Sequence, residues 1–152
     1  MDERERVLLT LSGVRVFMGI FWLVNLFWRL PTDFGDGDHW GLPHILDEAR
    51  AHGISPLARS VVVHVLQPHM TVVGWLVFAV GLITGLSLVL GVATRLGAAL
   101  GLLQAIVLTL FLGDAPGEWL YAYLMLVLLS ALLLLLPVSR RLSIDDALGR
   151  DP

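Results

Sequence analysis

The fold is decided by residues 70–112, which read MTVVGWLVFAVGLITGLSLVLGVATRLGAALGLLQAIVLTLFL. This stretch contains a single charged residue, Arg95, which lies beside a short turn between two apolar blocks. Each block has about 20 residues, and because an α-helix rises 1.5 Å per residue, each is close to the ~30 Å needed to cross a hydrocarbon core. The pattern predicts two adjacent transmembrane helices joined by a tight turn.

The composition of the whole chain also indicates a membrane environment. Of its 152 residues, 57% are hydrophobic and 15% are charged, whereas soluble domains average about 45–50% and about 25%. The mean hydropathy is +0.81. A domain this small cannot hide so much apolar surface in one core, because small folds leave a large share of their surface exposed. We therefore expect lipid around the apolar segments.

The ionisable residues exclude several classes of function. The chain has no Cys, which removes disulfides, thiolate metal sites and a cysteine nucleophile, so any redox role requires a bound cofactor or a partner. The net charge is −3, and the 10 basic residues are all Arg. The chain has no clustered basic face of the kind that nucleic-acid binding requires.

Four apolar segments predict an all-α, integral membrane four-helix bundle that forms a single membrane domain over residues 1–152. The expected spans are about 7–30, 70–91, 96–112 and 119–136, with an outer loop at 31–69 and a cytoplasmic tail at 137–152. The run LMLVLLSALLLLL at 124–136 lacks the alternation of a membrane β-barrel. The acidic start of the chain lacks the basic region of a cleaved signal peptide, so the first span is expected to remain.

The distribution of Arg predicts the orientation, because cytoplasmic loops carry an excess of positive charge. One side of the expected bundle carries Arg4, Arg6, Arg95, Arg140, Arg141 and Arg150. The other side carries Arg29, Arg50 and Arg59, which are spread through a long acidic loop. We therefore expect a multi-pass protein of a prokaryotic-type cytoplasmic membrane, with both termini in the cytoplasm.

The outer loop has an organisation of its own. The pattern LPHILDEARAHG at 42–53 predicts a short amphipathic helix that ends at Gly53. Ser55 as N-cap and Pro56 in the first turn predict a second one. We expect both helices to lie at the outer surface or over the mouth of the bundle.

A metal site is conceivable in this loop. His44, Glu48 and His52 share one stripe of the first helix, and zinc accepts imidazole and carboxylate ligands. The alternative, which we favour, is a solvated polar face with no metal.

Polar side chains within the spans are informative, because exposure to lipid is costly. Ser12, Arg15, Gly19, Trp22, Leu26 and Arg29 recur every three or four residues, so we expect this face to point into the bundle. Arg15 lies two turns inside the first helix. It either extends to the cytoplasmic boundary to pair with an acid such as Glu5, Asp145 or Asp146, or holds an anion or a polar quinone head group. Asn25 and Gln104 add hydrogen-bonding amides.

Four segments follow one another along the chain: GVRVFMGIFW, GWLVFAVGLITGLSLVLGVATRLGAALG, EWLYAYLMLVLLSALLLL and SRRLSIDDAL. In their order and spacing they resemble the DoxX/DoxD family of small four-helix membrane proteins. The long first loop is more like the DoxD type, the small subunit of thiosulfate:quinone oxidoreductase. One departure is Gly81, which stands where many members carry a Glu.

The resemblance implies a membrane subunit of a quinone-linked redox system. A quinone or similar hydrophobic molecule would bind near Arg15, Trp22, Asn25 and Gln104, and a second membrane subunit or a soluble redox partner would supply the electron chemistry. The alternative is a non-catalytic membrane scaffold or anchor for soluble enzymes, and a homo-oligomer is compatible with either. A small-molecule carrier is a third and weaker hypothesis.

The tail SRRLSIDDAL is expected to fold back as a short helix capped by Ser143. In this prediction, ion pairs that involve Arg95, Arg140 and Asp145 dock the tail on the cytoplasmic end of the bundle.

Overall fold

A computed structural model describes residues 3–37 and 41–136, and the described chain is helical with connecting turns. The all-α prediction is confirmed for these residues. The elements are α1 (Glu3–Asn25), η1 (Leu26–Arg29), α2 (Leu42–His52), α3 (Pro56–Val61), η2 (Val62–Leu66), η3 (Gln67–His69), α4 (Met70–Leu90), α5 (Thr94–Leu112) and α6 (Leu120–Leu135). The tail interactions expected of Arg140, Ser143 and Asp145 lie outside the described residues.

Three helical stretches are long and apolar enough to cross a membrane by length and composition: Glu5–Asn25, Pro56–Leu90 and Thr94–Leu112. The second is 35 residues long, because α3 continues into α4 through η2, a π-helical turn, and η3, a 3-10 turn that contains Pro68. Pro68 therefore lies at a change of helix type and does not interrupt the helical stretch. The fourth apolar segment forms α6, which has 16 residues.

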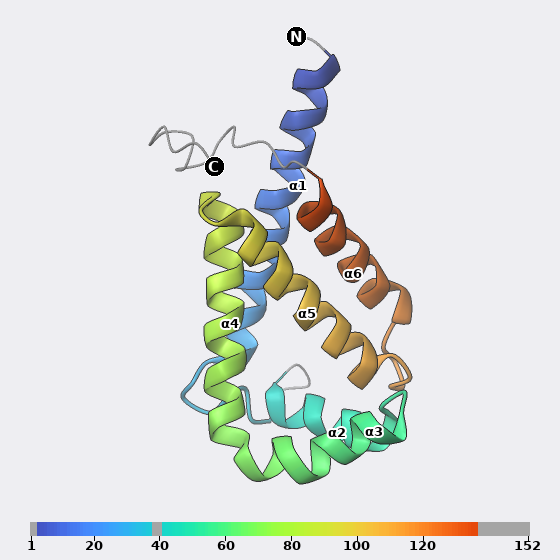
Figure 1. Ribbon diagram of the computed structural model, residues 1–152. Coiled ribbons are helices and arrows are strands. Elements are labelled where there is room, and N and C mark those ends of the chain that lie inside the picture. The colour runs from blue at the N-terminus through green and yellow to red at the C-terminus, as the bar shows by residue number, and fades with distance from the viewer. Residues whose placement is uncertain (1–2, 38–40, 137–152) are drawn as a thin grey trace.

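The long helices pack in sequence around one core: α1 on α4, α4 on α5, and α5 on α6. In Figure 1, α1 begins and α6 ends at the same end of the bundle as the turn between α4 and α5. We call this the closed end. From it, α4 and α5 diverge toward the other end, where α2 and α3 lie across the space between them (Figure 1). We call that the open end.

Small residues bring α4 and α5 together at the closed end. Gly91 adopts the left-handed conformation, at φ 71°, and ends α4. The Ser87 hydroxyl oxygen lies 2.6 Å from the carbonyl oxygen of Val92 and 3.0 Å from that of Ala93. A Cβ at Gly97 would lie 2.6 Å from this hydroxyl oxygen, so the Ser87 side chain leaves no space for a larger residue at position 97 unless it shifts.

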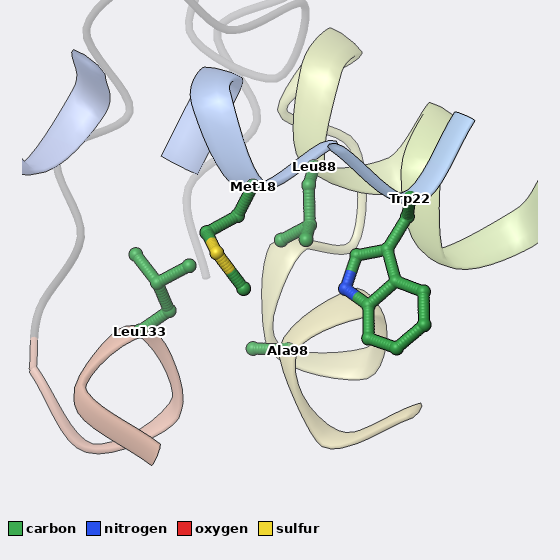
Figure 2. Close-up of a cluster of buried hydrophobic side chains, with 5 residues drawn as sticks. All are labelled: Met18, Trp22, Leu88, Ala98 and Leu133. Carbon is green, nitrogen blue, oxygen red and sulfur yellow. The ribbon is translucent and has the colours of Figure 1, made fainter. Parts of the chain in front are cut away.

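The core of the closed end takes side chains from all four long helices. Figure 2 shows Met18 and Trp22 from α1 beside Leu88 of α4, Ala98 of α5 and Leu133 of α6. Each of these five side chains is at most 2% exposed. Burial at this level is therefore independent of any surrounding lipid and supplies the dispersion contacts that hold the helices together.

The α2–α3 segment covers the open end of the bundle, where α4 and α5 lie apart. Helix α2 buries Leu42, Ile45, Leu46 and Ala49. Ser55 accepts a hydrogen bond of 3.1 Å from the amide of Ala58, the N-cap geometry. The Ile54 amide donates to the carbonyl of Leu110 at 3.1 Å, and this bond fixes the turn between α2 and α3 to α5.

A further close contact joins α1 to α4. A Cβ at Gly19 would lie 2.8 Å from the Val89 amide nitrogen and 2.9 Å from the Gly85 carbonyl oxygen. Both of these atoms belong to the backbone, so they cannot move aside as a flexible side chain would. The contact between α1 and α4 therefore requires glycine at position 19.

We predict that Gly19→Ala destabilises the bundle by about 1–3 kcal/mol, because overpacking at a backbone contact forces the helices apart. Thermal unfolding in detergent measures the effect. Gly13→Ala on the same helix is the matched control, since a Cβ there meets nothing within 4 Å. Equal melting temperatures for the two variants would show that the contact at Gly19 does not limit packing.

Candidate ligand-binding site

An apolar cavity of about 390 Å³ lies where α4 and α5 diverge. Its walls are formed mainly by Val73, Val77 and Val80 of α4 and by Leu103, Val107 and Phe111 of α5. Leu42, Ile45 and Leu46 of α2 contribute the third side. Only two polar side chains, Arg29 and Gln104, are among the lining residues. We call this space the apolar chamber.

A second cavity, of about 500 Å³, lies beside the chamber. It is lined by residues of α1, η1, α2, α5, the 113–119 connection and α6. Its polar lining residues are Asn25, Arg29, His44, Glu48, Glu118 and Tyr123, and its aromatic ones include Phe21, Trp22 and Trp119. We call this space the polar pocket.

Three residues, Arg29, Ile45 and Leu108, line both cavities. The chamber and the pocket therefore adjoin and form one composite site with an apolar part and a polar part. Their volumes are within the range of small-molecule sites, about 300–1,000 Å³. An arrangement of this kind suits a molecule that has an apolar tail and a polar head.

Arg29 is the residue at the junction. It ends η1, and its side chain is 9% exposed. Its Nε atom is buried without a hydrogen-bond partner, and no ion pair or hydrogen bond of its guanidinium occurs within residues 3–37 and 41–136. A buried charge normally has such partners, because leaving it unpaired is costly.

The two carboxylates of the polar pocket are already engaged. Glu48 Oε2 lies 3.1 Å from His52 Nδ1, and the Tyr123 hydroxyl donates a 2.5 Å hydrogen bond to Glu118 Oε2. Neither carboxylate makes an ion pair with Arg29 within the described chain. Within the described part of the chain, the polar pocket thus contains one buried cation, Arg29, whose guanidinium forms no hydrogen bond.

Three of the four residues expected at a ligand site line these cavities. Trp22 and Asn25 line the polar pocket, where the Asn25 amide nitrogen donates to the Phe21 carbonyl at 2.8 Å. Gln104 lines the chamber and donates to the Thr84 hydroxyl at 3.2 Å. Arg15, the first choice, is fully buried but lines neither cavity. The arginine that lines both cavities is Arg29.

Arg29 lies on the interior face that the periodicity predicts, together with Ser12, Arg15 and Trp22. It was not among the residues expected at a ligand site. The periodicity continues through Leu26 to Arg29 and indicates an interior position, but it carries no signal for which interior residues line a cavity.

The metal candidates do not come together as a set. Within the described part of the chain, no three His, Cys, Asp or Glu side chains are grouped so that they could hold a metal ion. Glu48 and His52 form a pair, and His44 and Glu48 line the polar pocket. His44, Glu48 and His52 therefore do not form a common metal site.

Comparison with known proteins adds no identification. No protein-family model, no curated protein and no solved structure matches this chain.

The Tyr123–Glu118 hydrogen bond connects α6 to the preceding turn and shapes the polar pocket. We predict that Tyr123→Phe lowers stability by about 1–2 kcal/mol, because a hydrogen bond to a charged group is lost and Glu118 is left without its donor. Thermal unfolding in detergent measures this. Tyr121→Phe is the control, since Tyr121 is 77% exposed on the same helix. An equally small change in both variants would contradict this role.

Proposed function

We propose that α1, α4, α5 and α6 all cross a prokaryotic-type cytoplasmic membrane, with both termini in the cytoplasm and the α2–α3 segment at the outer surface. Large apolar side chains on the outside of the bundle support this, for example Phe17, Ile83, Leu96 and Leu128. Water would make such a surface unfavourable, whereas lipid does not. Helix α6 is about 24 Å long by the helical rise, and a span of that length is accommodated by local thinning of the bilayer.

Within this topology, we propose that the chain is a DoxX/DoxD-like small subunit of a quinone-linked redox system. The quinone or similar hydrophobic molecule binds in the composite site, with its tail in the apolar chamber and its head in the polar pocket. A second membrane subunit or a soluble partner carries out the electron transfer, because the chain itself has no Cys. The observation that carries this proposal is the direct junction of the two cavities at Arg29, Ile45 and Leu108.

The proposed topology predicts which positions react with a membrane-impermeant maleimide in intact cells. The natural chain is free of Cys, so single cysteines give an unambiguous signal. We expect labelling from outside at Thr32→Cys and Asp114→Cys, and none at Arg6→Cys or Arg95→Cys until the membrane is permeabilised. Labelling of Asp114→Cys and Arg95→Cys from the same side would show that α5 does not cross the membrane.

The proposed ligand site predicts a specific effect of filling the chamber. Val77→Trp, inside the chamber, should weaken binding of decyl benzoquinone by about tenfold or more, because the indole occupies the space of the tail. Isothermal titration of the purified protein measures the affinity. Val72→Trp, at a 68% exposed position of the same helix that lines neither cavity, is the matched control. If the natural chain binds no quinone and co-purifies with a soluble enzyme, the anchor function replaces this proposal.

A further inference from the structure

The starting observation is the unusual state of Arg29. Its side chain is more than nine-tenths buried, it borders both cavities, and no hydrogen bond or ion pair occupies its guanidinium within the described chain. Arginine carries five N–H donors and keeps its charge in proteins. No group within residues 3–37 and 41–136 satisfies those donors, and the two cavities that Arg29 borders give a bound molecule access to them.

The charges around the polar pocket restrict what that group is. The lining carries one Arg, the two carboxylates Glu48 and Glu118, and the imidazole of His44. The two carboxylates outnumber the one guanidinium among these lining residues. An anionic head would gain from Arg29 but would be repelled by both carboxylates.

An uncharged head avoids this repulsion. A carbonyl oxygen accepts hydrogen bonds from a guanidinium and places only a partial negative charge in the pocket. The aromatic lining, Phe21, Trp22 and Trp119, suits a planar ring. The apolar chamber on the other side of Arg29 leaves space for a tail without polar groups.

We infer that Arg29 is the head-group-binding and specificity-determining residue of the site, and that it selects uncharged amphiphiles with a carbonyl-bearing head over anionic ones. The inference rests on the proposed function, namely that a hydrophobic molecule occupies the composite site. It goes beyond that proposal by assigning the residue and by excluding fatty acids and other oxyanion amphiphiles as the natural occupant.

The test uses the purified full chain and three probes whose alkyl tails have nine or ten carbons: decyl benzoquinone, decanoate and decylbenzene. Isothermal titration gives the affinity of each probe for the natural chain, for Arg29→Gln and for Arg50→Gln. Arg50 is the matched control, because it is exposed on α2 and lines neither cavity. Decylbenzene has no head group, so it reports whether the chamber is intact in each variant.

We expect the natural chain to bind decyl benzoquinone more tightly than decanoate. Arg29→Gln should weaken benzoquinone binding by about tenfold to a hundredfold, the range for a hydrogen bond to a charged group. It should leave decylbenzene binding unchanged, and Arg50→Gln should affect none of the probes. If Arg29→Gln does not fold, Arg29→Lys replaces it, since the ammonium lacks the planar fork and should also weaken benzoquinone binding.

Two results would overturn the inference and leave the proposed function standing. One is benzoquinone binding that is the same in the natural chain and in the Arg29 variant. The other is tighter binding of decanoate than of benzoquinone to the natural chain. If the natural chain binds none of the three probes, the proposed function fails as well.

Discussion

The close approach of α4 and α5 at their shared turn is the constraint on which the rest of the structure depends. Gly97 lies against Ser87, and Gly91 turns the chain in a conformation that other residues rarely adopt. Further along, the hydrogen bond between Gln104 and Thr84 still joins the two helices. The two helices diverge toward the open end (Figure 1). The apolar chamber is lined by residues of both. A hairpin held tightly at one end thus creates a cavity at the other.

Helix α1 connects the two ends. Gly19 and Gly85 hold it against α4 at the closed end, where Met18 and Trp22 enter the common core (Figure 2). Two buried arginines, Arg15 in α1 and Arg29 in the following η1, lie at different levels of the bundle. Arg15 lies in the interior at the closed end, and Arg29, roughly 20 Å further along by the helical rise, reaches the junction of the chamber and the polar pocket. The packing of α1 therefore determines where a buried charge borders the two cavities.

Much of the helical structure could be predicted from local sequence, because apolar runs, caps and prolines act over a few residues. The segment 70–91 forms α4 almost to the residue, and Ser55 and Pro56 begin α3. The start of α1 at Glu3, a turn before the expected Val7, follows from the polar residues there, which extend a helix without extending the apolar segment. The continuity of α3 into α4 depends on a π-helical turn for which the sequence carries no simple signal.

The site could be predicted only in part, because it depends on how helices diverge. Trp22, Asn25 and Gln104 were identifiable as polar or aromatic groups on interior faces, and they do line the cavities. Arg15 was preferred because it lies deep within an apolar segment, but depth along a helix does not say where space remains. That space arises where α2 enters between α4 and α5, an arrangement of elements far apart in sequence.

The most direct test is an experimental density map of the full chain in a lipid nanodisc with decyl benzoquinone. We expect α4 and α5 to be separated at Val77 and Val107, with elongated density between them that ends in a planar feature at the Arg29 guanidinium. A map in which Val77 packs directly on Val107 and Arg29 pairs with Glu48 or Glu118 would contradict the existence of the site.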